Sequence, residues 1–183
     1  MLKSLTGYER YRTSGQRAGV RAVAGAHPGS TVLVVLPTGS GKTLLFEVAA
    51  LLEPSKLSLL IVPTVSLALD LQQRFEQNLG LAHSIAWTGN MTVEEKTAME
   101  ERISQGRQTI LVTSPESATA SLAELLNKVA AEGRLGLFAV DEAHMVAEWG
   151  GSFRPAFQHL AGLHRKLKES VPQRQSDFTT LLM

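Results

Sequence analysis

The sequence predicts an α/β fold with a mostly parallel central sheet flanked by helices, and three observations support this prediction. Short apolar runs alternate along the chain with segments of helical composition, which is typical of parallel strands joined by right-handed crossovers. The runs at 57–62 and 135–140 are apolar almost throughout, as expected when helices cover both faces of a strand. An apolar run at 31–35 leads through a glycine-bearing loop into 44–52, which is rich in helix-forming residues.

Apolar periodicity and turn residues place the individual elements. Strands are expected at 31–36, 57–62, 81–87, 109–113, 135–140 and 178–183, and helices at 8–26, 44–52, 66–78, 92–105, 115–131 and 155–169. Pro28 ends the first helix because proline disfavours the helical state of the residue before it. Thr92 and Glu95 form the pattern of a capping box, and Pro115 suits the first turn of a helix.

Length and composition exclude several classes of protein. The 183 residues suit one domain, 1–183, and the chain has 44% hydrophobic and 19% charged residues, which is ordinary for a globular protein. No segment approaches the ~20 apolar residues of a membrane span, and the start lacks a signal-peptide core. The chain has no cysteine, which excludes disulfides and cysteine-ligated metals, so we expect neither a membrane partner nor a structural zinc. A cytoplasmic location, or a nuclear one in a eukaryote, fits these properties.

The net charge of +1 does not identify a partner. One basic group lies near the end of the chain, and we interpret it as a solvated helix face. Its members are Arg165, Lys166, Lys168 and Arg174.

The loop at 36–43 carries the first functional signal. Glycines let backbone N–H groups turn inward around a phosphate chain, and the start of the following helix adds positive potential. Lys42 reaches the outer phosphates, and Thr43 can ligate Mg²⁺. The usual eight-residue pattern opens with glycine, whereas this loop opens with Leu36; its Gly-Ser-Gly-Lys-Thr end is intact. The loop therefore predicts a nucleotide site at which Mg²⁺ can bind.

The second functional signal is an acidic pair directly after the apolar run at 135–140. Ligand sites in parallel sheets gather at the carboxyl ends of the strands, where the loop at 36–43 also lies. Phosphoryl transfer to water needs a metal clamp and a positioned water. Asp141 is placed to hold Mg²⁺, and Glu142 to orient or deprotonate the attacking water.

Together, the Gly-Ser-Gly-Lys-Thr sequence at 39–43 and the Asp-Glu-Ala-His sequence at 141–144 resemble the DEAH-type helicases of superfamily 2. The stretch 141–155 runs from this acidic box through Trp149-Gly150 to Phe153-Arg154-Pro155, and it is similar to motif II and the aromatic-rich loop of the RecQ family. The resemblance covers nearly the whole chain. It implies a three-layer RecA-like P-loop NTPase domain, in which the last strand lies between the phosphate-loop strand and the acidic-box strand.

The resemblance also implies roles for individual residues. Tyr8, Tyr11, Arg12 and Gln16 match the adenine-reading segment, although Arg12 and Gln16 lie one residue further apart than is expected for RecQ. His144 would bridge the nucleotide and DNA sites. The catalytic residues are then Lys42, Asp141, Glu142 and His144. The residues assigned to ATP are Tyr8, Tyr11, Arg12, Gln16, Thr38, Gly39, Ser40, Gly41, Lys42 and Thr43. Those assigned to Mg²⁺ are Thr43 and Asp141.

Single-stranded or partly unwound DNA is the partner that the resemblance implies. The segments 63–70 and 113–116 are similar to motif Ia and the next DNA-contacting motif, and hydroxyl residues at helix starts suit phosphate contacts. Trp149 and Phe153 flank a glycine-containing stretch and can stack on unpaired bases. The residues assigned to DNA are Pro63, Thr64, Ser66, Thr113, Ser114, Pro115, Glu116, Trp149, Phe153 and Arg154.

The chain stops inside the predicted strand 178–183, just short of the Ser-Ala-Thr motif that follows in the family. We therefore expect a first motor lobe whose partner is a second RecA-like lobe of the same protein. Two alternatives remain at this point. One is a nucleotide-regulated DNA-binding switch, or a translocase that does not separate strands. The other is a P-loop ATPase unrelated to nucleic acid, against which the stretch 149–155 argues.

Overall fold

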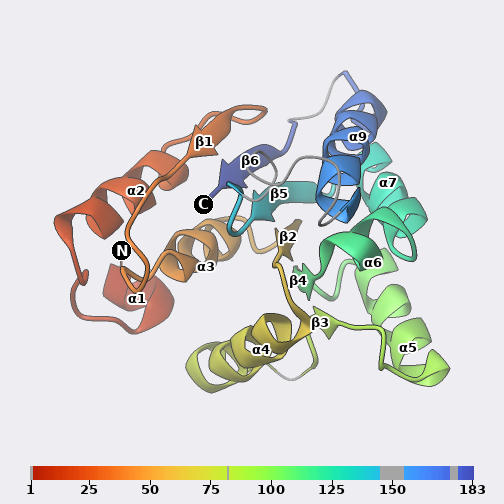
Figure 1. Cartoon of the computed structure of the whole chain (residues 1–183), viewed down its shortest axis with the longest axis horizontal. Coiled ribbons are helices and arrows are strands. Elements are labelled where there is room, and N and C mark those ends of the chain that lie inside the picture. The colour runs from red at the N-terminus through yellow and green to blue at the C-terminus, as the bar shows by residue number, and fades with distance from the viewer. Residues whose placement is uncertain (1, 82, 145–154, 174–176) are drawn as a thin grey trace.

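The computed structural model describes residues 2–81, 83–144, 155–173 and 177–183, with the side chains of 155–157 left out. Within these residues six strands form one sheet in the order β1-β6-β5-β2-β4-β3, and every adjacent pair is parallel (Figure 1). The strands are β1 (Thr31–Leu33), β2 (Leu57–Ile61), β3 (Ala86–Trp87), β4 (Ile110–Thr113), β5 (Leu135–Val140) and β6 (Thr179–Leu182). The predicted α/β class with a parallel sheet is confirmed.

Helices cover both faces of this sheet. They are α1 (Leu2–Thr6), α2 (Ser14–Ala24), α3 (Thr43–Leu52), α4 (Val65–Leu79), α5 (Val93–Ser104), α6 (Pro115–Thr119), α7 (Ala123–Ala131) and α9 (Pro155–Ser170). In the described residues, no helix is both long enough and apolar enough to cross a membrane.

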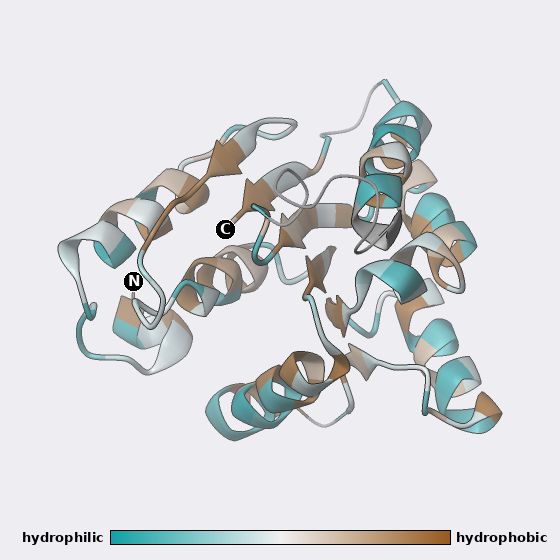
Figure 2. Ribbon diagram, in the orientation of Figure 1, coloured by the Kyte–Doolittle hydropathy of each residue, from teal (hydrophilic) through white to brown (hydrophobic). Residues whose placement is uncertain are grey.

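Two apolar cores lie on opposite faces of the sheet, and successive strand residues alternate between them. Leu60 of β2 belongs to the core under α2, α3 and α4, where Phe46 and Phe75 stack with ring centroids 6.1 Å apart. Leu59 and Ile61 belong to the core under α5, α6, α7 and α9. Figure 2 shows the strands in brown between helices that alternate teal and brown. The apolar strands of the sequence are thus explained by burial on both faces.

The strand β6 lies between β1 and β5, as the resemblance implied. Thr31 of β1 is in register with Thr180 of β6, and Leu137 of β5 with Thr179. A single strand, β6, therefore separates β1, which precedes the phosphate loop, from β5, which Asp141 follows.

Two helices differ from their predictions. The first begins at Ser14 rather than residue 8, because Thr13 adopts an extended backbone and its hydroxyl accepts a hydrogen bond from the Gln16 N–H. The predicted helix 115–131 is divided into α6 and α7. At this break side-chain hydroxyls bond back to the backbone, Thr119 Oγ1 to the Pro115 carbonyl at 2.8 Å and Ser121 Oγ to the Ser117 carbonyl at 3.4 Å, and such bonds weaken a regular helix.

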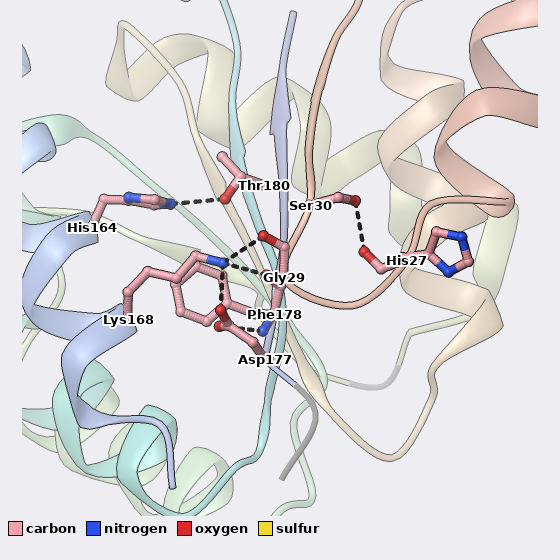
Figure 3. Close-up of polar contacts among 8 residues, drawn as sticks. All are labelled: His27, Gly29, Ser30, His164, Lys168, Asp177, Phe178 and Thr180. Atoms are coloured by element: carbon pink, nitrogen blue, oxygen red, sulfur yellow. Dashed lines mark hydrogen bonds and ion pairs between the residues drawn. The ribbon is translucent and has the colours of Figure 1, made fainter. Parts of the chain in front are cut away.

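Lys168 on α9 is a structural residue, which corrects the interpretation of its basic group as a solvated face. Its ammonium donates to the carbonyl oxygens of Gly29 at 3.1 Å and Phe178 at 3.0 Å, and it pairs with Asp177 at 2.8 Å (Figure 3). One side chain thereby joins α9, the turn before β1 and the start of β6. One helical turn earlier, His164 Nε2 lies 2.8 Å from Thr180 Oγ1, and burial together with the charge of Lys168 lowers the pKa of His164.

Candidate nucleotide-binding and catalytic site

The predicted catalytic segments meet at one edge of the sheet, because all the strands run parallel and end there. The Val34 N–H donates to the Leu182 carbonyl at 2.9 Å, which continues the pairing of β1 toward the phosphate loop. The Asp141 N–H donates to the Ile61 carbonyl at 2.9 Å, so the acidic box begins while it is still held against β2. The sheet itself therefore fixes where both segments start.

The loop 36–43 has the backbone of a phosphate cradle. Gly39 and Gly41 have φ angles of +79° and +80°, a left-handed conformation that glycine adopts without steric cost. Within the described residues no side chain caps α3, which begins at Thr43. Uncapped N–H groups at a helix start suit an anion. The buried hydroxyl of Ser40 also has no hydrogen-bond partner among the described residues. These features fit the triphosphate of ATP.

Glu142 lies between two cationic or potentially cationic side chains. Its Oε1 is 3.7 Å from the Lys42 ammonium, and its Oε2 is 3.2 Å from His144 Nδ1. Glu142 has a φ angle of +52°, and among the residues that the structure describes it is the one non-glycine residue with a positive φ. A carboxylate that the backbone holds in an uncommon conformation beside the lysine of a glycine-bearing loop is typical of a functional site.

Asp141 has the carboxylate oxygens that a divalent cation would need. Its side chain is half-buried and accepts a hydrogen bond from the Glu142 N–H at 3.0 Å. Burial raises the pKa of Asp141, with a smaller contribution from the charge of Glu142, while the Glu142 N–H and Lys42 oppose the shift. Among the described residues there is no cluster of three or more histidine, aspartate or glutamate side chains. This fits Mg²⁺, which proteins bind through one or two carboxylates together with substrate phosphates.

A pocket of about 170 Å³ lies beside the phosphate loop, and we call it the base pocket. Its lining residues are Tyr8, Arg10, Arg12, Gln16, Gly41, Leu44, Glu47 and Arg74. This volume is below the ~300–1,000 Å³ of sites for drug-sized ligands and suits a nucleobase rather than a whole nucleotide. Three of the four predicted adenine-reading residues are thus brought together. The fourth, Tyr11, packs against the core instead.

Gln16 connects the base pocket to the phosphate loop. Its Nε2 donates to the Gly41 carbonyl at 2.9 Å, and its Oε1 accepts from the Arg12 N–H at 2.8 Å. Gln16 is only 2% exposed. Its amide therefore holds the loop and the preceding segment together in this structure.

Sequence reasoning missed Glu47, Arg10 and Arg74 in the base pocket. Glu47 could have been recognised in the sequence, because it is the single charged residue of a largely apolar helix. Arg74 could not, since one arginine on the polar face of α4 is ordinary.

The predicted DNA-contacting residues fall into three groups. Thr64 and Ser66 are exposed at the start of α4, where Thr64 Oγ1 accepts from the Leu67 N–H at 3.2 Å. Ser114 caps α6, and Glu116 next to it is exposed. Thr113 is fully buried and donates to the Trp87 carbonyl at 3.1 Å. Half-buried Pro63 and buried Pro115 flank these helix starts, while Trp149, Phe153 and Arg154 lie outside the described residues.

The largest of the pockets found in the described residues, about 580 Å³, lies elsewhere. It opens between α4 and α5 beside β3, and none of the predicted nucleotide-binding residues line it. Its size alone does not connect it to the chemistry at the sheet edge.

Comparison with known proteins identifies the family. A family model described as DEAD/DEAH box helicase matches residues 13–183. ATP-dependent DNA helicase RecQ of Haemophilus influenzae is 32% identical over 164 residues, covering 89% of this chain and 25% of the relative. ATP-dependent DNA helicase Q5 of Mus musculus is 30% identical over 190 residues, covering 96% of this chain and 19% of the relative. The chain thus spans a quarter or less of the length of these relatives.

Solved structures show the same fold. The crystal structure of the DUF1998 helicase MrfA matches with a TM-score of 0.71 at 19% identity, covering 99% of this chain and 28% of MrfA. The helicase domain of Pyrococcus furiosus Hef matches with a TM-score of 0.59 at 22% identity, covering 92% of this chain and 31% of the Hef chain. With its parallel sheet, its phosphate loop and its Asp-Glu-Ala-His box, the chain belongs to the DEAD/DEAH box helicase family.

Proposed function

We propose that this chain is the ATP-binding lobe of a RecQ-like, ATP-dependent DNA helicase or translocase, which couples ATP hydrolysis to movement along single-stranded DNA. The observation that carries the proposal is the distance of 3.7 Å between the Lys42 ammonium and the Glu142 carboxylate. The two groups lie at the sheet edge beside the start of α3, which no side chain caps among the described residues. A cation that would bind phosphate and a carboxylate that would activate water lie close together there.

The residues divide the chemistry between them. Lys42 and the N–H groups of residues 39–43 would bind the phosphates, and Gln16, Tyr8 and Arg12 would surround the base. Thr43 and Asp141 would hold Mg²⁺, which supplies charge neutralisation at the transferring phosphoryl group. Glu142 would orient the attacking water and accept its proton.

His144 lies on the outer side of Glu142, with its side chain 55% exposed. Its contact with Glu142 restrains the carboxylate from the side opposite Lys42. A ligand that engages His144 would change how Glu142 is held. This gives a physical route by which bound DNA would affect the water-activating group.

DNA would lie along the sheet edge formed by the ends of β2 and β4. The exposed residues there, Thr64, Ser66 and Glu116, stand at the starts of α4 and α6. The two helices follow the paired strands β2 and β4, and helix starts suit contacts to phosphates. MrfA, a structural neighbour, has been solved bound to DNA and AMPPNP, and its TM-score against this chain is 0.69 at 20% identity over 92% of this chain and 23% of MrfA. The family resemblance also assigns Trp149, Phe153 and Arg154 to DNA binding; these three residues lie outside the described part of the chain.

A second motor lobe would complete the ATP site in the longer protein. The relatives are at least four times as long as the matched segment, which leaves room for such a lobe. An arginine supplied across the cleft can be worth ~10³–10⁵ in rate. The 183 residues alone should therefore bind ATP and hydrolyse it slowly. We expect the protein to be located where DNA is, in the cytoplasm of a prokaryote or in the nucleus of a eukaryote.

The test is a strand-displacement and ATPase assay on the longer protein, with wild type compared with Lys42→Ala. We expect ATP turnover that single-stranded DNA stimulates, together with displacement, and both lost in the variant. DNA-stimulated turnover without displacement would support the translocase or switch instead. Appreciable DNA-stimulated turnover by the 183 residues alone would contradict the need for a second lobe.

A further inference from the structure

Glu47 is a buried carboxyl whose hydrogen-bonding capacity is unused. Its exposed fraction is 0%, and neither carboxyl oxygen has a hydrogen-bond partner among the described residues. A buried polar group normally has such a partner, because leaving it without one costs free energy. The side chain nevertheless lines the base pocket beside Gln16 and Gly41. An unsatisfied carboxyl at the wall of a ligand pocket indicates a partner that arrives with the ligand.

Two other polar side chains of the pocket wall, Gln16 and Tyr8, already have hydrogen-bond partners. Both ends of the Gln16 amide are occupied by Gly41 and Arg12, and the Tyr8 hydroxyl accepts from Asn78 Nδ2 at 2.8 Å. Glu47 lines the same pocket, and its carboxyl has no hydrogen-bond partner among the described residues. Its position on α3, four residues after Thr43, places it one helical turn beyond the phosphate-binding start of the helix.

The chemistry of a neutral carboxyl matches adenine. It presents one O–H donor beside one carbonyl acceptor. Adenine presents the complementary pair, the N6 amino donor beside the N7 acceptor, whereas guanine presents two acceptors, N7 and O6, at the same edge. An ionised carboxylate only accepts and loses the bond to the ring nitrogen. Neutral Glu47 would therefore favour adenine over guanine.

Burial provides the neutral form near physiological pH. It raises the pKa of Glu47 to about 7, and the charge of Arg74 acts in the opposite direction. The other titratable or charged groups lining the pocket are Tyr8 and Arg10 and Arg12 from the segment before α2. Between about pH 6 and 8, Glu47 therefore passes from the neutral to the ionised form.

We propose that Glu47 reads the base of the bound nucleotide, with a neutral carboxyl that donates to a ring nitrogen of adenine and accepts from its amino group. This inference rests on the proposed binding of ATP at the neighbouring phosphate loop. It assigns to the base pocket a specificity residue outside the Tyr8–Gln16 segment. It also makes the preference for adenine dependent on pH.

The experiment measures dissociation constants of Mg–ATP and Mg–GTP by calorimetry at pH 6 and pH 8. Wild type, Glu47→Gln and Glu47→Leu are compared, with Glu53→Gln at the end of α3 as the matched control. In wild type the neutral fraction of a group with a pKa near 7 falls about tenfold over this range, and the affinity for ATP should fall by roughly the same factor. The preference for ATP over GTP should fall with it.

Glu47→Gln should keep the preference for ATP at both pH values, because the carboxamide also offers a donor beside an acceptor and does not titrate. Glu47→Leu should lose most of the preference, and Glu53→Gln should behave as wild type. Since the same nucleotides are used throughout, their own titration cancels between wild type and Glu47→Gln.

Two outcomes would overturn the inference, and they are distinguishable from failure of the proposed function. If Glu47→Gln and wild type lose affinity for ATP equally between pH 6 and pH 8, Glu47 does not read the base. The same holds if Glu47→Leu keeps the wild-type preference for ATP. If wild type binds neither nucleotide at either pH, the proposed ATP site itself is wrong and the inference fails with it.

Discussion

The Lys42 ammonium lies 3.7 Å from Oε1 of Glu142, although the two residues are 100 positions apart in the chain. The pair joins the two ends of the proposed reaction, since Lys42 would bind phosphate and Glu142 would activate water. In this structure their opposite charges partly offset one another. A bound phosphate chain would compete for Lys42 and leave Glu142 as the free base.

Glu142→Gln should separate ATP binding from ATP hydrolysis in the longer protein. The carboxamide keeps the shape of the side chain and removes the base, so turnover should fall by about 10²–10⁴. The affinity for ATP should stay the same or rise, because Lys42 loses an anionic competitor. Steady-state turnover and equilibrium binding check this, with exposed Glu100→Gln as the control. Equal losses of binding and turnover would count against the assigned role.

Gly41→Ala and Gly39→Ala test the connection between the phosphate loop and the base pocket. Both positions have a positive φ near 80°, so alanine is strained at either. A Cβ at Gly41 would lie 2.5 Å from Gln16 Nε2, whereas one at Gly39 would meet nothing within 4 Å. Gln16 cannot move away without losing its two hydrogen bonds.

Gly41→Ala should therefore lower the free energy of unfolding by about 1–3 kcal/mol more than Gly39→Ala does. Urea denaturation without nucleotide measures the difference. Equal destabilisation of the two variants would show that Gln16 adapts freely and does not hold the loop.

Glu47→Gln should stabilise the protein in a manner that depends on pH. Because burial raises the pKa of Glu47 from 4.5 to about 7, the unfolded chain releases this proton more readily than the folded one. The stabilisation from the neutral carboxyl is fully present below pH 4.5 and is lost as the pH rises through 7. At 1.36 kcal/mol per pKa unit, the loss is on the order of 3 kcal/mol.

The variant should consequently be more stable than wild type at pH 8 and close to it at pH 5. Urea denaturation of both proteins at the two pH values checks this. A difference in stability that is the same at pH 5 and pH 8 would contradict the raised pKa.

Lys168→Met should destabilise the fold, because it removes the ammonium that joins α9 to β1 and β6 and leaves Asp177 without its cation. We expect a loss of about 1–3 kcal/mol in the free energy of unfolding. Lys166→Met, on the exposed face of the same helix, is the matched control and should change stability by less than about 0.5 kcal/mol. Thermal or urea denaturation gives both values. Similar losses in the two variants would indicate a general effect of charge on α9.

The sequence predicted what is encoded locally. Apolar runs such as 57–62 and 135–140 identified buried strands, because burial on both faces removes polar residues from them. Gly39, Gly41 and Lys42 identified the phosphate loop, because the backbone demands of the loop restrict its residue types. These features need no knowledge of distant contacts.

What the sequence did not predict depends on contacts between distant segments. Lys168 looked like one more residue of a solvated basic face, and its carbonyl partner on Gly29 lies 139 positions away. Tyr11 fits the adenine-reading pattern by spacing, yet it is partly buried against the core and is not among the lining residues of the base pocket. Glu47 lines that pocket from α3, a helix whose other residues are mostly apolar. The break at 120–122 lies beside hydroxyl groups that bond back to the helix backbone, a feature that hydrophobic periodicity does not register.

The central claim is that the loop at 36–43 binds ATP through Lys42, and equilibrium titration with Mg–ATP tests it most directly. Wild type, Lys42→Ala and Lys56→Ala are compared; Lys56 pairs with Glu53 at 3.1 Å, away from the loop. The account predicts saturable binding by wild type and Lys56→Ala with similar dissociation constants. It predicts a loss of about 10- to 100-fold or more in Lys42→Ala, the range expected for charge-assisted bonds to phosphate. Binding by Lys42→Ala with the wild-type dissociation constant would contradict the claim.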